Sequence, residues 1–552
     1  MSAGTDALRA ELARAAEQLG APAGVEPLLE RPRDPAFGDW ATNLAMMLAK
    51  PLGQKPRELA QRLIESIDRE AAGISSAEIA GPGFINFRMD PGRVAQGIVA
   101  LVEAGPEYGR STSANARCPV VVEFVSANPT GPLHVGHGRQ AALGDAIASL
   151  LEWTGWKVSR EFYYNDAGVQ IENLALSTQA RVRELAGESV QIPDGGYHGA
   201  YIGEIAQRYV AEHPSDAHGD DLEAIRAFAV QALRREQDLD MQAFGVVFQT
   251  YYLESSLYSD GRVDRTVGAL RASGKTYEKD GALFLRTTEY GDDQDRVMRK
   301  SAEKGGTFTY FVPDVAYHVT KWERGYTRAI NVQGADHHST VTRVRAGLQA
   351  LDMGIPKDYP EYVLHQMVTV MKGGEEMKIS KRAGSYVTVR DLIDEVGRDA
   401  VRYFFLMRKG DSQLSFDVDL ARSQSEENPV YYIQMAHARM SGIFRVGEID
   451  PTTIDAAGAD LSVLVLDEEV ALMKALLDFP ALVANAAEAL EPHRVATYLH
   501  DTAGKIHHWY HTAHVLNEPE AITRARLVLA RAAQIVIRNG LTMLGITAPD
   551  RM

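Results

Sequence analysis

The chain has 552 residues, of which 45% are hydrophobic, and its formal net charge at pH 7 is −16. This length and apolar content predict a globular protein of three domains. The single cysteine, Cys118, excludes disulfides within the chain and zinc sites built from several thiolates. We find no apolar stretch long enough to span a bilayer and no signal-peptide centre in residues 1–20, so we expect a cytoplasmic protein without a membrane partner.

Residues 1–112 are expected to form the first domain. Helical patterns alternate there with short strand patterns, and the polar stretch YGRSTSANAR at 108–117 predicts a linker. Within this domain Asn86 stands between Phe84 and Phe87 in the segment GPGFINFRMD. Two interpretations of Asn86 stay open: a strand-end asparagine that bonds the backbone, or a residue of a binding surface.

A strand, a turn and a helix are expected in succession over residues 120–153. Val120, Val121, Val122, Phe124 and Val125 predict a covered parallel strand, and a turn rich in proline and glycine follows. After Gly138, apolar residues recur at helical spacing, so the helix begins beside His134 and His137. Backbone N–H groups at a helix N-terminus favour anions, the small Gly136 permits close approach of a base or ribose, and imidazoles can donate to phosphate. This layout predicts a nucleotide site.

A pair of histidines three residues apart does not by itself decide the chemistry. His134 and His137 could equally be structural histidines or metal ligands on successive turns. A second pair, His337 and His338, also suggests metal, but no further cluster of ligand type lies nearby in the sequence. We therefore expect no metal centre and no structural zinc.

The region 113–420 alternates strand and helix patterns as a doubly wound sheet does, with nucleotide expected at the strand C-termini. An insertion near residues 170–250, partly acidic and rich in glycine, interrupts it. From about residue 421 the pattern is helical, without convincing strands. Basic and imidazole side chains gather between His493 and Arg538, and Trp509 and Tyr510 among them could stack on unpaired bases. The alternative is an ordinary helical bundle with a charged outer face.

Three segments in order resemble one family. They are SANPTGPLHVGHGR at 126–139, MKISKRAG at 377–384, and the run from DLIDEVGRDAVRYFF at 391–405 to HARMSGIFR at 437–445. Together they resemble the arginyl-tRNA synthetases, which belong to the class I aminoacyl-tRNA synthetases, and the resemblance covers nearly the whole chain. It implies an α/β fold: a Rossmann-like doubly wound parallel sheet with an N-terminal α+β domain and a C-terminal all-α bundle. The implied domains are a tRNA-elbow-binding domain at 1–112, a catalytic domain at 113–420, and an anticodon-binding domain at 421–552.

The resemblance also implies the reaction and its partners. The family activates L-arginine with ATP and Mg²⁺ to arginyl-adenylate and pyrophosphate, then transfers arginine to the terminal ribose of tRNA(Arg), as a monomer. The implied ATP-binding residues are His134, Gly136 and His137 with Lys378 and Lys381. The two lysines and Ser380 lie in the loop at 378–382, where positive charge stabilises the departing pyrophosphate. Gly373-Gly374 before this loop suits a segment that moves, and a solvated basic loop is the alternative.

A guanidinium is a planar, permanently charged group, so a selective pocket should offer carboxylates and an aromatic wall. The family's side-chain contacts match Glu254, Tyr310 and Asp314. A four-residue spacing places the last two on one helix face, and Pro313 permits only a first turn there. Positions that hold the α-amino and α-carboxylate groups match Glu123 and Asn128, bordered by His134. Where some members carry a glutamine, this chain has Asp336-His337, so His337 is a further candidate.

Two rival functions remain open from the sequence. The first is a class I ligase for another amino acid, against which Glu254, Tyr310 and Asp314 argue. The second is a non-catalytic tRNA-binding paralogue, which should have lost parts of its phosphate site, whereas both histidines and both loop lysines are present. Neither the anticodon-reading residues nor the role of the insertion follows from the sequence, although the resemblance makes Asn86 a candidate contact to tRNA.

Overall fold

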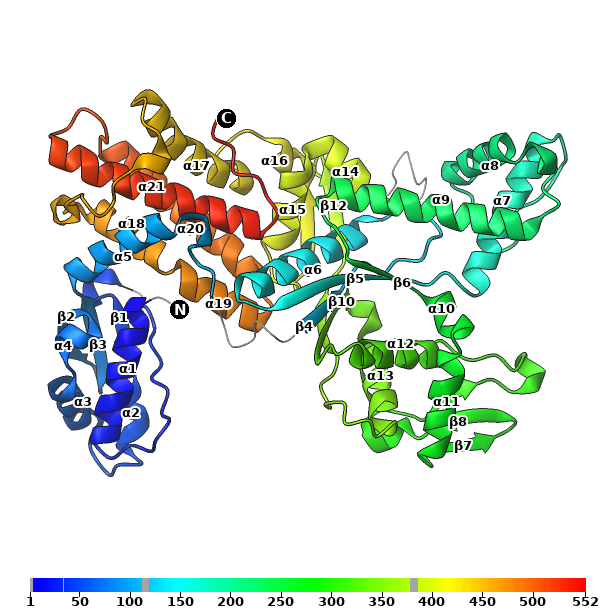
Figure 1. Ribbon diagram of the computed structural model, residues 1–552, viewed down its shortest axis with the longest axis horizontal. Helices are drawn as coiled ribbons and strands as arrows, with labels where there is room; N and C mark the ends of the chain where they lie inside the picture. The colour runs from blue at the N-terminus through cyan, green and yellow to red at the C-terminus, as the bar shows by residue number, and fades with distance from the viewer. Residues whose placement is uncertain (1–2, 33, 112–118, 378–385) are drawn as a thin grey trace.

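A five-stranded parallel sheet forms the centre of the molecule (Figure 1). The computed structural model describes residues 3–32, 34–111, 119–377 and 386–552. The strand order is β11-β10-β4-β5-β6, and each neighbouring pair is parallel. The strands are β4 (Pro119–Glu123), β5 (Lys157–Tyr164), β6 (Thr250–Leu253), β10 (Arg328–Gly334) and β11 (Glu361–His365). The expected doubly wound α/β class is confirmed, and the order reverses between β4 and β10, where such sheets bind ligands.

Alternating side chains of β4 face two different layers of helices. Val120 and Val122 pack in a core with helix α6 (Val135–Trp153). Val121 packs on the other face, in a core with α12 (Phe311–Glu323) and α13 (His338–Ala350). Because both faces are covered, the strand is a continuous β-branched run.

The strand β4 ends at Glu123, two residues earlier than the valine run predicts. Val125 and Ser126 have positive φ angles of 68° and 43°, a conformation that is rare for a β-branched residue. The prediction that Val125 belongs to the strand is therefore wrong. The sharp turn carries Ser126 back toward the strand end, where its Oγ donates to Glu123 Oε1 at 2.9 Å.

The N-terminal domain has a separate core. Its antiparallel sheet has the order β1-β3-β2, and four helices cover it. The elements are α1 (Ala3–Gln18), β1 (Trp40–Thr42), α2 (Leu44–Ala49), α3 (Pro56–Ser66), α4 (Arg69–Ala72), β2 (Ile74–Ala80) and β3 (Phe84–Met89). The following helix, α5 (Pro91–Ala104), packs against the C-terminal bundle.

The predicted insertion consists of three helices that project from the sheet at the upper right of Figure 1. They are α7 (Val169–Leu185), α8 (Ala200–Glu212) and α9 (Leu222–Ala243). Leu174, Ile202 and Leu233, one from each helix, form a small core of their own. A second excursion holds α10 (Glu254–Ser259), α11 (Arg262–Ala272) and the small sheet of β7 (Thr276–Lys279), β8 (Ala282–Leu285) and β9 (Arg296–Arg299).

The C-terminal region is helical, as expected: residues 421–552, all of which are described, contain no strand. Its long helices are α17 (Pro429–Val446), α18 (Asp467–Leu477), α19 (Phe479–Ala489), α20 (His493–Thr512) and α21 (Glu520–Met543). Between sheet and bundle lie β12 (Val368–Lys372), β13 (Glu375–Glu376), α14 (Val389–Val396), α15 (Arg398–Leu406), β14 (Leu414–Asp417) and α16 (Val418–Arg422). The buried Arg402 ties the parts together, since it donates to Leu544 O at 2.9 Å and to Asp145 Oδ2 of α6 at 2.5 Å.

One segment of the bundle corrects the prediction that no apolar stretch could span a membrane. Residues Asp467–Ala489 are long and apolar enough by length and composition. They comprise two helices, however, since α18 ends and α19 begins around Asp478. Leu472, Phe479 and Val483 of this segment are fully buried in the protein core. This packing is that of core helices.

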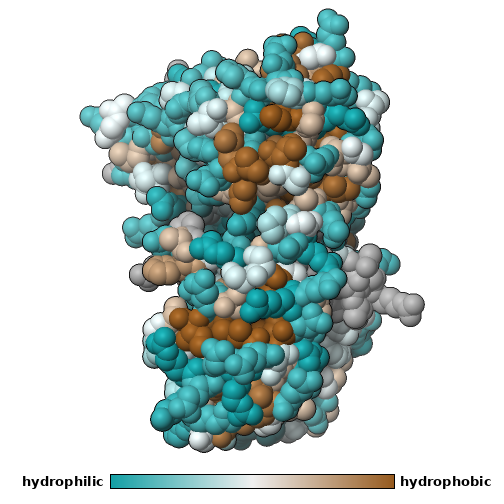
Figure 2. Space-filling model, turned by 90° about the vertical axis from the view of Figure 1, so that its left-hand side faces the viewer, coloured by the Kyte–Doolittle hydropathy of each residue, from teal (hydrophilic) through white to brown (hydrophobic). Residues whose placement is uncertain are grey.

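The N-terminal domain and the bundle are joined by ion pairs. Arg31 pairs with Asp478 at 2.5 Å, and Lys474 pairs with Asp39 at 2.5 Å. Figure 2 shows this end of the molecule, with hydrophobic side chains gathered over the bundle above and over the N-terminal domain below. Both parts carry exposed large hydrophobic residues: Leu28, Phe37, Met47 and Phe84 in the first, Val446, Val465 and Leu466 in the second.

Candidate functional site

The two histidines at the start of α6 cap the helix. His134 is the N-cap residue, and its Nδ1 accepts from the backbone N–H groups of Gly136 at 3.0 Å and His137 at 3.3 Å. His137 Nδ1 accepts in return from His134 N at 3.3 Å. The rings stack with their centroids 3.7 Å apart. One nitrogen of each ring is therefore used by the fold.

This capping fixes the protonation of both rings. An Nδ1 that accepts a hydrogen bond carries no proton, so the neutral tautomer has its proton on Nε2. Burial lowers the pKa of His134 and lowers the pKa of His137 well below its usual value. Near pH 7 both side chains are thus neutral Nε2–H donors beside the N-terminus of a buried helix. That arrangement suits an anionic ligand.

Gly136 serves the histidine rather than leaving open space. A Cβ at this position would lie 2.8 Å from His134 Cε1, closer than such contacts occur. Glycine therefore lets the His134 ring fold back over the first turn of α6. The sequence predicts that Gly136 admits a base or ribose. The geometry gives a different reason for the glycine, which is the close approach of the His134 ring.

Two of the candidate carboxylates, Glu254 and Asp314, lie close enough for the charge of one to affect the other. Glu254 begins α10 and accepts from the Tyr163 hydroxyl at 2.9 Å, and Asp314 lies in the first turn of α12. Burial, then the nearby charge of Asp166, raises the pKa of Glu254 to about 7, although the Tyr163 hydrogen bond opposes this shift. Burial, then the charges of Glu254 and Glu123, raises the pKa of Asp314 to about 8. The described residues offer neither carboxylate a cation within ion-pair distance.

Aromatic side chains surround these carboxylates. Tyr163 packs on Tyr317 with ring centroids 4.3 Å apart. Burial, then the charges of Glu254 and Asp314 and the hydroxyl of Tyr310, raises the pKa of Tyr258 to about 12. Tyr258 is thus near both carboxylates and near Tyr310. Tyr310 is the N-cap residue of α12 and 60% exposed, so it forms the rim, and Pro313 lies in the first turn as predicted.

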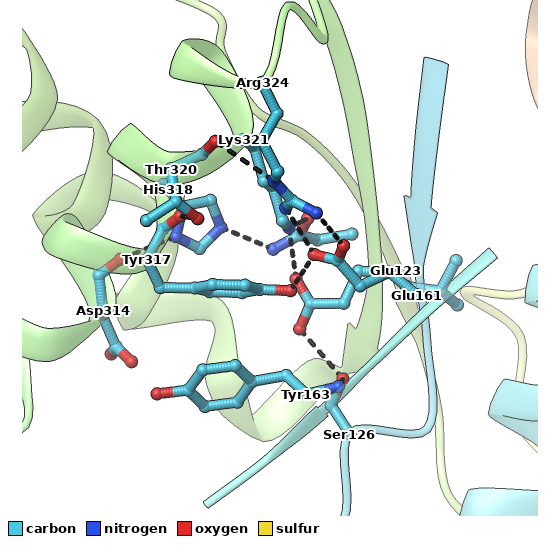
Figure 3. A network of polar contacts seen from close by, with 12 residues as sticks. Glu123, Ser126, Glu161, Tyr163, Asp314, Tyr317, His318, Thr320, Lys321 and Arg324 are labelled. Atoms are coloured by element: carbon cyan, nitrogen blue, oxygen red, sulfur yellow. Dashed lines mark hydrogen bonds and ion pairs between the residues drawn. The ribbon is translucent and has the colours of Figure 1, made fainter. Parts of the chain in front are cut away.

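Glu123 lies at the end of β4 and is only 5% exposed (Figure 3). Its Oε2 is 2.5 Å from Lys321 Nζ, and its Oε1 accepts from Ser126. The nearby Asn128 is partly buried and donates from Nδ2 to Gln170 Oε1 of α7. Sequence reasoning did not identify Lys321. The available signal was its position: seven residues after Asp314, on the same face of a largely buried helix.

A cavity of about 720 Å³ adjoins these residues. It runs past the histidines and beneath the insertion, whose side chains form part of its wall. Tyr197, His198 and Tyr201 come from the insertion, and none of them was predicted. The residues that define the cavity are Ser126, Asn128, His134, His137, Tyr197, His198, Tyr201, Gln237, His337 and Tyr386.

Of the remaining candidate residues, the structure describes His337 but not those of the lysine loop. The His337 side chain is 59% exposed, lies 3.6 Å from Asp336 Oδ2 and borders the cavity. Lys378, Ser380 and Lys381 lie outside the described residues. Gly373 and Gly374, which were expected to belong to a moving approach, instead form the two-residue turn between β12 and β13, with φ of 61° and 80°. A tight hairpin of this kind requires positive φ at both positions, which explains the glycines.

Of the candidate nucleic-acid contacts, Asn86 and Tyr510 face outward, whereas Trp509 lies in the core. Asn86 lies within the central strand β3, opposite Ala41 and Glu78, so the interpretation as a strand-end asparagine is wrong. Its neighbours Ile85 and Phe87 face the core, which leaves Asn86 on the outer face with Phe84. In α20, Trp509 is fully buried and Tyr510 is 41% exposed. The prediction that Trp509 could stack on bases is therefore wrong, because the apolar face of α20 carries it into the core.

Family models match nearly the whole chain. A model of the arginyl tRNA synthetase N terminal domain matches residues 6–89, one of the class I (R) tRNA synthetase catalytic domain matches 99–415, and one of the DALR anticodon binding domain matches 433–552. The chain is 57% identical over 545 residues to the arginine–tRNA ligase of Bordetella petrii, covering 96% of each protein. It is 56% identical over 541 residues to that of Methylibium petroleiphilum, covering 95% of each.

A solved structure has the same arrangement. The chain superposes on the arginyl-tRNA synthetase of Thermus thermophilus with a TM-score of 0.75, covering 99% of this chain and all of the other. The two sequences are 24% identical. At that identity the likeness concerns the fold, and the family rests on the sequence matches.

Proposed function

The chain belongs to the arginyl-tRNA synthetase family. We therefore propose that the site at the ends of β4, β5 and β10 holds arginine beside ATP. The chain is an aminoacyl-tRNA ligase that activates L-arginine with ATP and transfers it to tRNA. In the first step an oxygen of the arginine carboxylate attacks the α-phosphate, and pyrophosphate leaves. In the second, a hydroxyl of the terminal ribose attacks the adenylate carbonyl, and AMP leaves.

The guanidinium is assigned to Glu254 and Asp314, with Tyr310 at the rim. The observation that carries this assignment is that the buried Glu254 and the partly buried Asp314 both have raised pKa values and have no ion-pair partner among the described residues. Such a pair is costly unless a cation joins it. A planar guanidinium supplies that charge and donates several hydrogen bonds at once. The site therefore gains most from arginine among the amino acids.

The other end of arginine is assigned to Glu123 and Asn128. Glu123 would accept from the α-ammonium group, while Asn128, His134 and His337 border the α-carboxylate. This places the reactive carboxylate between the amino-acid pocket and the histidines. No side chain acts as a nucleophile in this scheme, so alignment of the two substrates supplies much of the rate enhancement.

The nucleotide, as its magnesium complex, is assigned to the cavity beside the helix α6. The Nε2–H groups of His134 and His137 would donate to oxygens on the reacting phosphates, where negative charge develops during the attack. Lys378 and Lys381 would neutralise the departing pyrophosphate, and Ser380 would stand between them in the same loop. The fit rests on the chemistry of the donors: neutral N–H groups and a helix N-terminus, both of which suit anions.

Three surfaces are assigned to tRNA. The insertion wall of the cavity, with Tyr197 and His198, would border the acceptor end. Asn86 on the outer face of the N-terminal sheet would contact the elbow. A groove of about 1010 Å³ in the bundle would take the anticodon loop, since cations and an exposed aromatic ring line it: Arg439, Arg445, Tyr510, His511, His514 and Arg551. This grouping lets a chain of net charge −16 present a basic surface locally. We further propose a monomeric, cytoplasmic protein specific for tRNA(Arg), with domain boundaries near residues 112 and 420.

The test is ATP-dependent charging of total tRNA with labelled arginine, run beside lysine, glutamine and cysteine, with and without RNase. We expect charging with arginine alone, and we expect RNase to abolish it. Charging with lysine would contradict the assignment of Glu254 and Asp314, because a pocket built for a planar fork should reject a point charge.

A further inference from the structure

Lys321 is the one lysine of the described catalytic region whose side chain is completely buried, and it has two polar partners and one aromatic one. Its Nζ lies 2.5 Å from Glu123 Oε2 and 2.9 Å from Asn331 Oδ1, and 4.5 Å from the centroid of the Tyr317 ring. Figure 3 shows Lys321 and Tyr317 of α12 beside Glu123 of β4, and Asn331 comes from β10. An ammonium group has three donors, so these contacts hold Lys321 in one position.

A second chain of hydrogen bonds fixes the orientation of Asn331. Its Nδ2 donates to His318 Nε2 at 2.8 Å, and His318 Nδ1 donates to Asp314 O at 2.8 Å. Burial, then the charge of Lys321, lowers the pKa of His318 to about 3, so the ring is neutral and can accept on Nε2. Asn331 therefore turns its oxygen toward Lys321. The chain runs from the helix turn that carries Asp314 to the carboxylate of Glu123.

The opposite side of Glu123 is held as well. Ser126 Oγ donates to Glu123 Oε1 at 2.9 Å and accepts from the backbone N–H of Tyr163 at 3.2 Å. Ser126 reaches this position only because Val125 and Ser126 adopt positive φ angles. Strained backbone is retained where the surrounding structure requires a particular placement. Glu123 is thus clamped from both sides.

The charges of the pocket explain why a lysine is needed here. The charges of Glu123 and Glu254 both act on Asp314, and of the described lysines and arginines only Lys321 forms an ion pair with any of these three carboxylates. When all four groups are ionised, two negative charges remain. Arginine brings two positive groups to this end of the site, the guanidinium and the α-ammonium. Lys321 therefore offsets part of the negative charge that faces the substrate.

We propose that Lys321 is a positioning residue for the substrate's α-ammonium group. It holds Glu123 in the accepting orientation and offsets part of the negative charge of the carboxylates that face the two substrate cations. The proposal rests on the assigned role of Glu123 under the proposed function. Lys321 does not touch the substrate itself and acts through Glu123, which Asn331 and His318 help it to hold.

The experiment compares arginine with 5-guanidinopentanoic acid, which is arginine without the α-amino group. The variant Lys321→Met keeps the side-chain volume but removes the charge. In full aminoacylation assays we expect the KM for arginine to rise on the order of tenfold or more, since Glu123 loses the contact that holds it in the accepting orientation. We expect the inhibition constant of the analogue and the KM for ATP to stay within about twofold, because neither ligand uses Glu123. An unchanged KM for arginine, or equal losses for both ligands, would overturn the proposal.

Two further variants separate the proposal from its premise. Glu123→Gln alone tests the premise: if the KM for arginine is unchanged, Glu123 does not bind the α-ammonium and both ideas fall. In the double variant Lys321→Met/Glu123→Gln, no buried charge is left unpaired, so folding is preserved even if Lys321→Met alone is unstable. We expect its KM for arginine to equal that of Glu123→Gln, the result for residues that act as a unit. A further rise in the double variant would show that Lys321 acts independently of Glu123 and would overturn the proposal.

The matched control is Arg324→Met, one turn further along the chain from Lys321. Arg324 pairs with Glu161 at 2.5 Å and has no contact with Glu123. We expect this variant to lower the melting temperature while the ratio of the arginine KM to the analogue's inhibition constant stays the same. A change in that ratio as large as that of Lys321→Met would mean that the ratio reports general damage, and the proposal would fail.

Discussion

The two ends of the substrate site satisfy their polar groups in opposite ways. At the nucleotide end, His134 and His137 use their Nδ1 atoms to cap α6, and burial keeps them neutral. At the amino-acid end, Glu254 and Asp314 have raised pKa values and no cationic partner within the described part of the chain. The hydrogen bonds of the histidines at the first end are made before substrate binds, whereas the charge at the second end is balanced only when arginine binds. We therefore propose that specificity for arginine lies at the end that the fold leaves electrostatically unbalanced.

The largest effect is expected at the unbalanced end. Asp314→Asn keeps the shape of the side chain but removes the charge that faces the guanidinium. Loss of one partner of a buried charge pair costs about 2–5 kcal/mol, so kcat/KM for arginine should fall roughly 30- to 5,000-fold. Steady-state aminoacylation measures this, and the KM for ATP should change little. A loss of less than threefold would remove Asp314 from the pocket.

The next prediction concerns the nucleotide end and separates capping from catalysis. Asparagine is a good N-cap residue but lacks an Nε2–H group, so His134→Asn should keep the stability of α6. We expect kcat to fall on the order of 10²-fold, as for the loss of one donor to developing charge, while the melting temperature changes by no more than about 2 °C. An unchanged kcat, or a fall in kcat accompanied by a large fall in melting temperature, would mean that His134 serves only the fold.

The third prediction uses pH to sharpen the contrast. The guanidinium favours ionised carboxylates, so arginine binding should release protons while Asp314, with a pKa of about 8, is still protonated. The KM for arginine should therefore fall roughly ten- to twentyfold between pH 7 and pH 9, and Asp314→Asn should reduce this change to about twofold, the part that comes from Glu254 with its pKa of about 7. The same raised pKa has an opposite effect on the free protein: its stabilising contribution is present at low pH and is lost as pH rises through about 8. A pH-independent KM would contradict the raised pKa of the pocket.

The smallest effect is expected in the C-terminal bundle, where the adjacent residues Trp509 and Tyr510 have different surroundings. Trp509 belongs to the core, and Tyr510 lines the basic groove. Tyr510→Ala should raise the KM for tRNA roughly five- to tenfold, as for the loss of one stacking platform, with the KM for arginine unchanged. Trp509→Phe should lower the melting temperature and leave the KM for tRNA alone. The reverse pattern would show that the groove has been assigned to the wrong residue.

The sequence predicted the parts of the site that local pattern determines. A valine run, a proline-rich turn and a helical repeat place His134 and His137 at a helix start without any tertiary information. The four-residue spacing of Tyr310 and Asp314 likewise indicated one helix turn, and α12 begins there. The α/β class and the helical C-terminal region followed from the same kind of periodicity.

What the sequence could not predict depends on contacts between distant segments. The Lys321–Glu123 pair joins residues 198 positions apart, and no local pattern distinguishes this buried lysine from an exposed one. Trp509 and Tyr510 are adjacent, so composition could not tell which faces the core. The early end of β4 depends on a turn that Ser126 completes by contacting Glu123 and Tyr163. Each of these outcomes is decided by tertiary packing.

If arginine completes the charge of its own pocket, its binding must release protons from Glu254 and Asp314. Titration of arginine into the protein at pH 7, by calorimetry in buffers of different ionisation enthalpy, counts the protons released on binding. We expect roughly one to one and a half protons per arginine bound, about nine-tenths from Asp314 and about half from Glu254, and only about half a proton for Asp314→Asn. Binding without proton release in the unaltered protein would show that the carboxylates are already balanced before arginine binds.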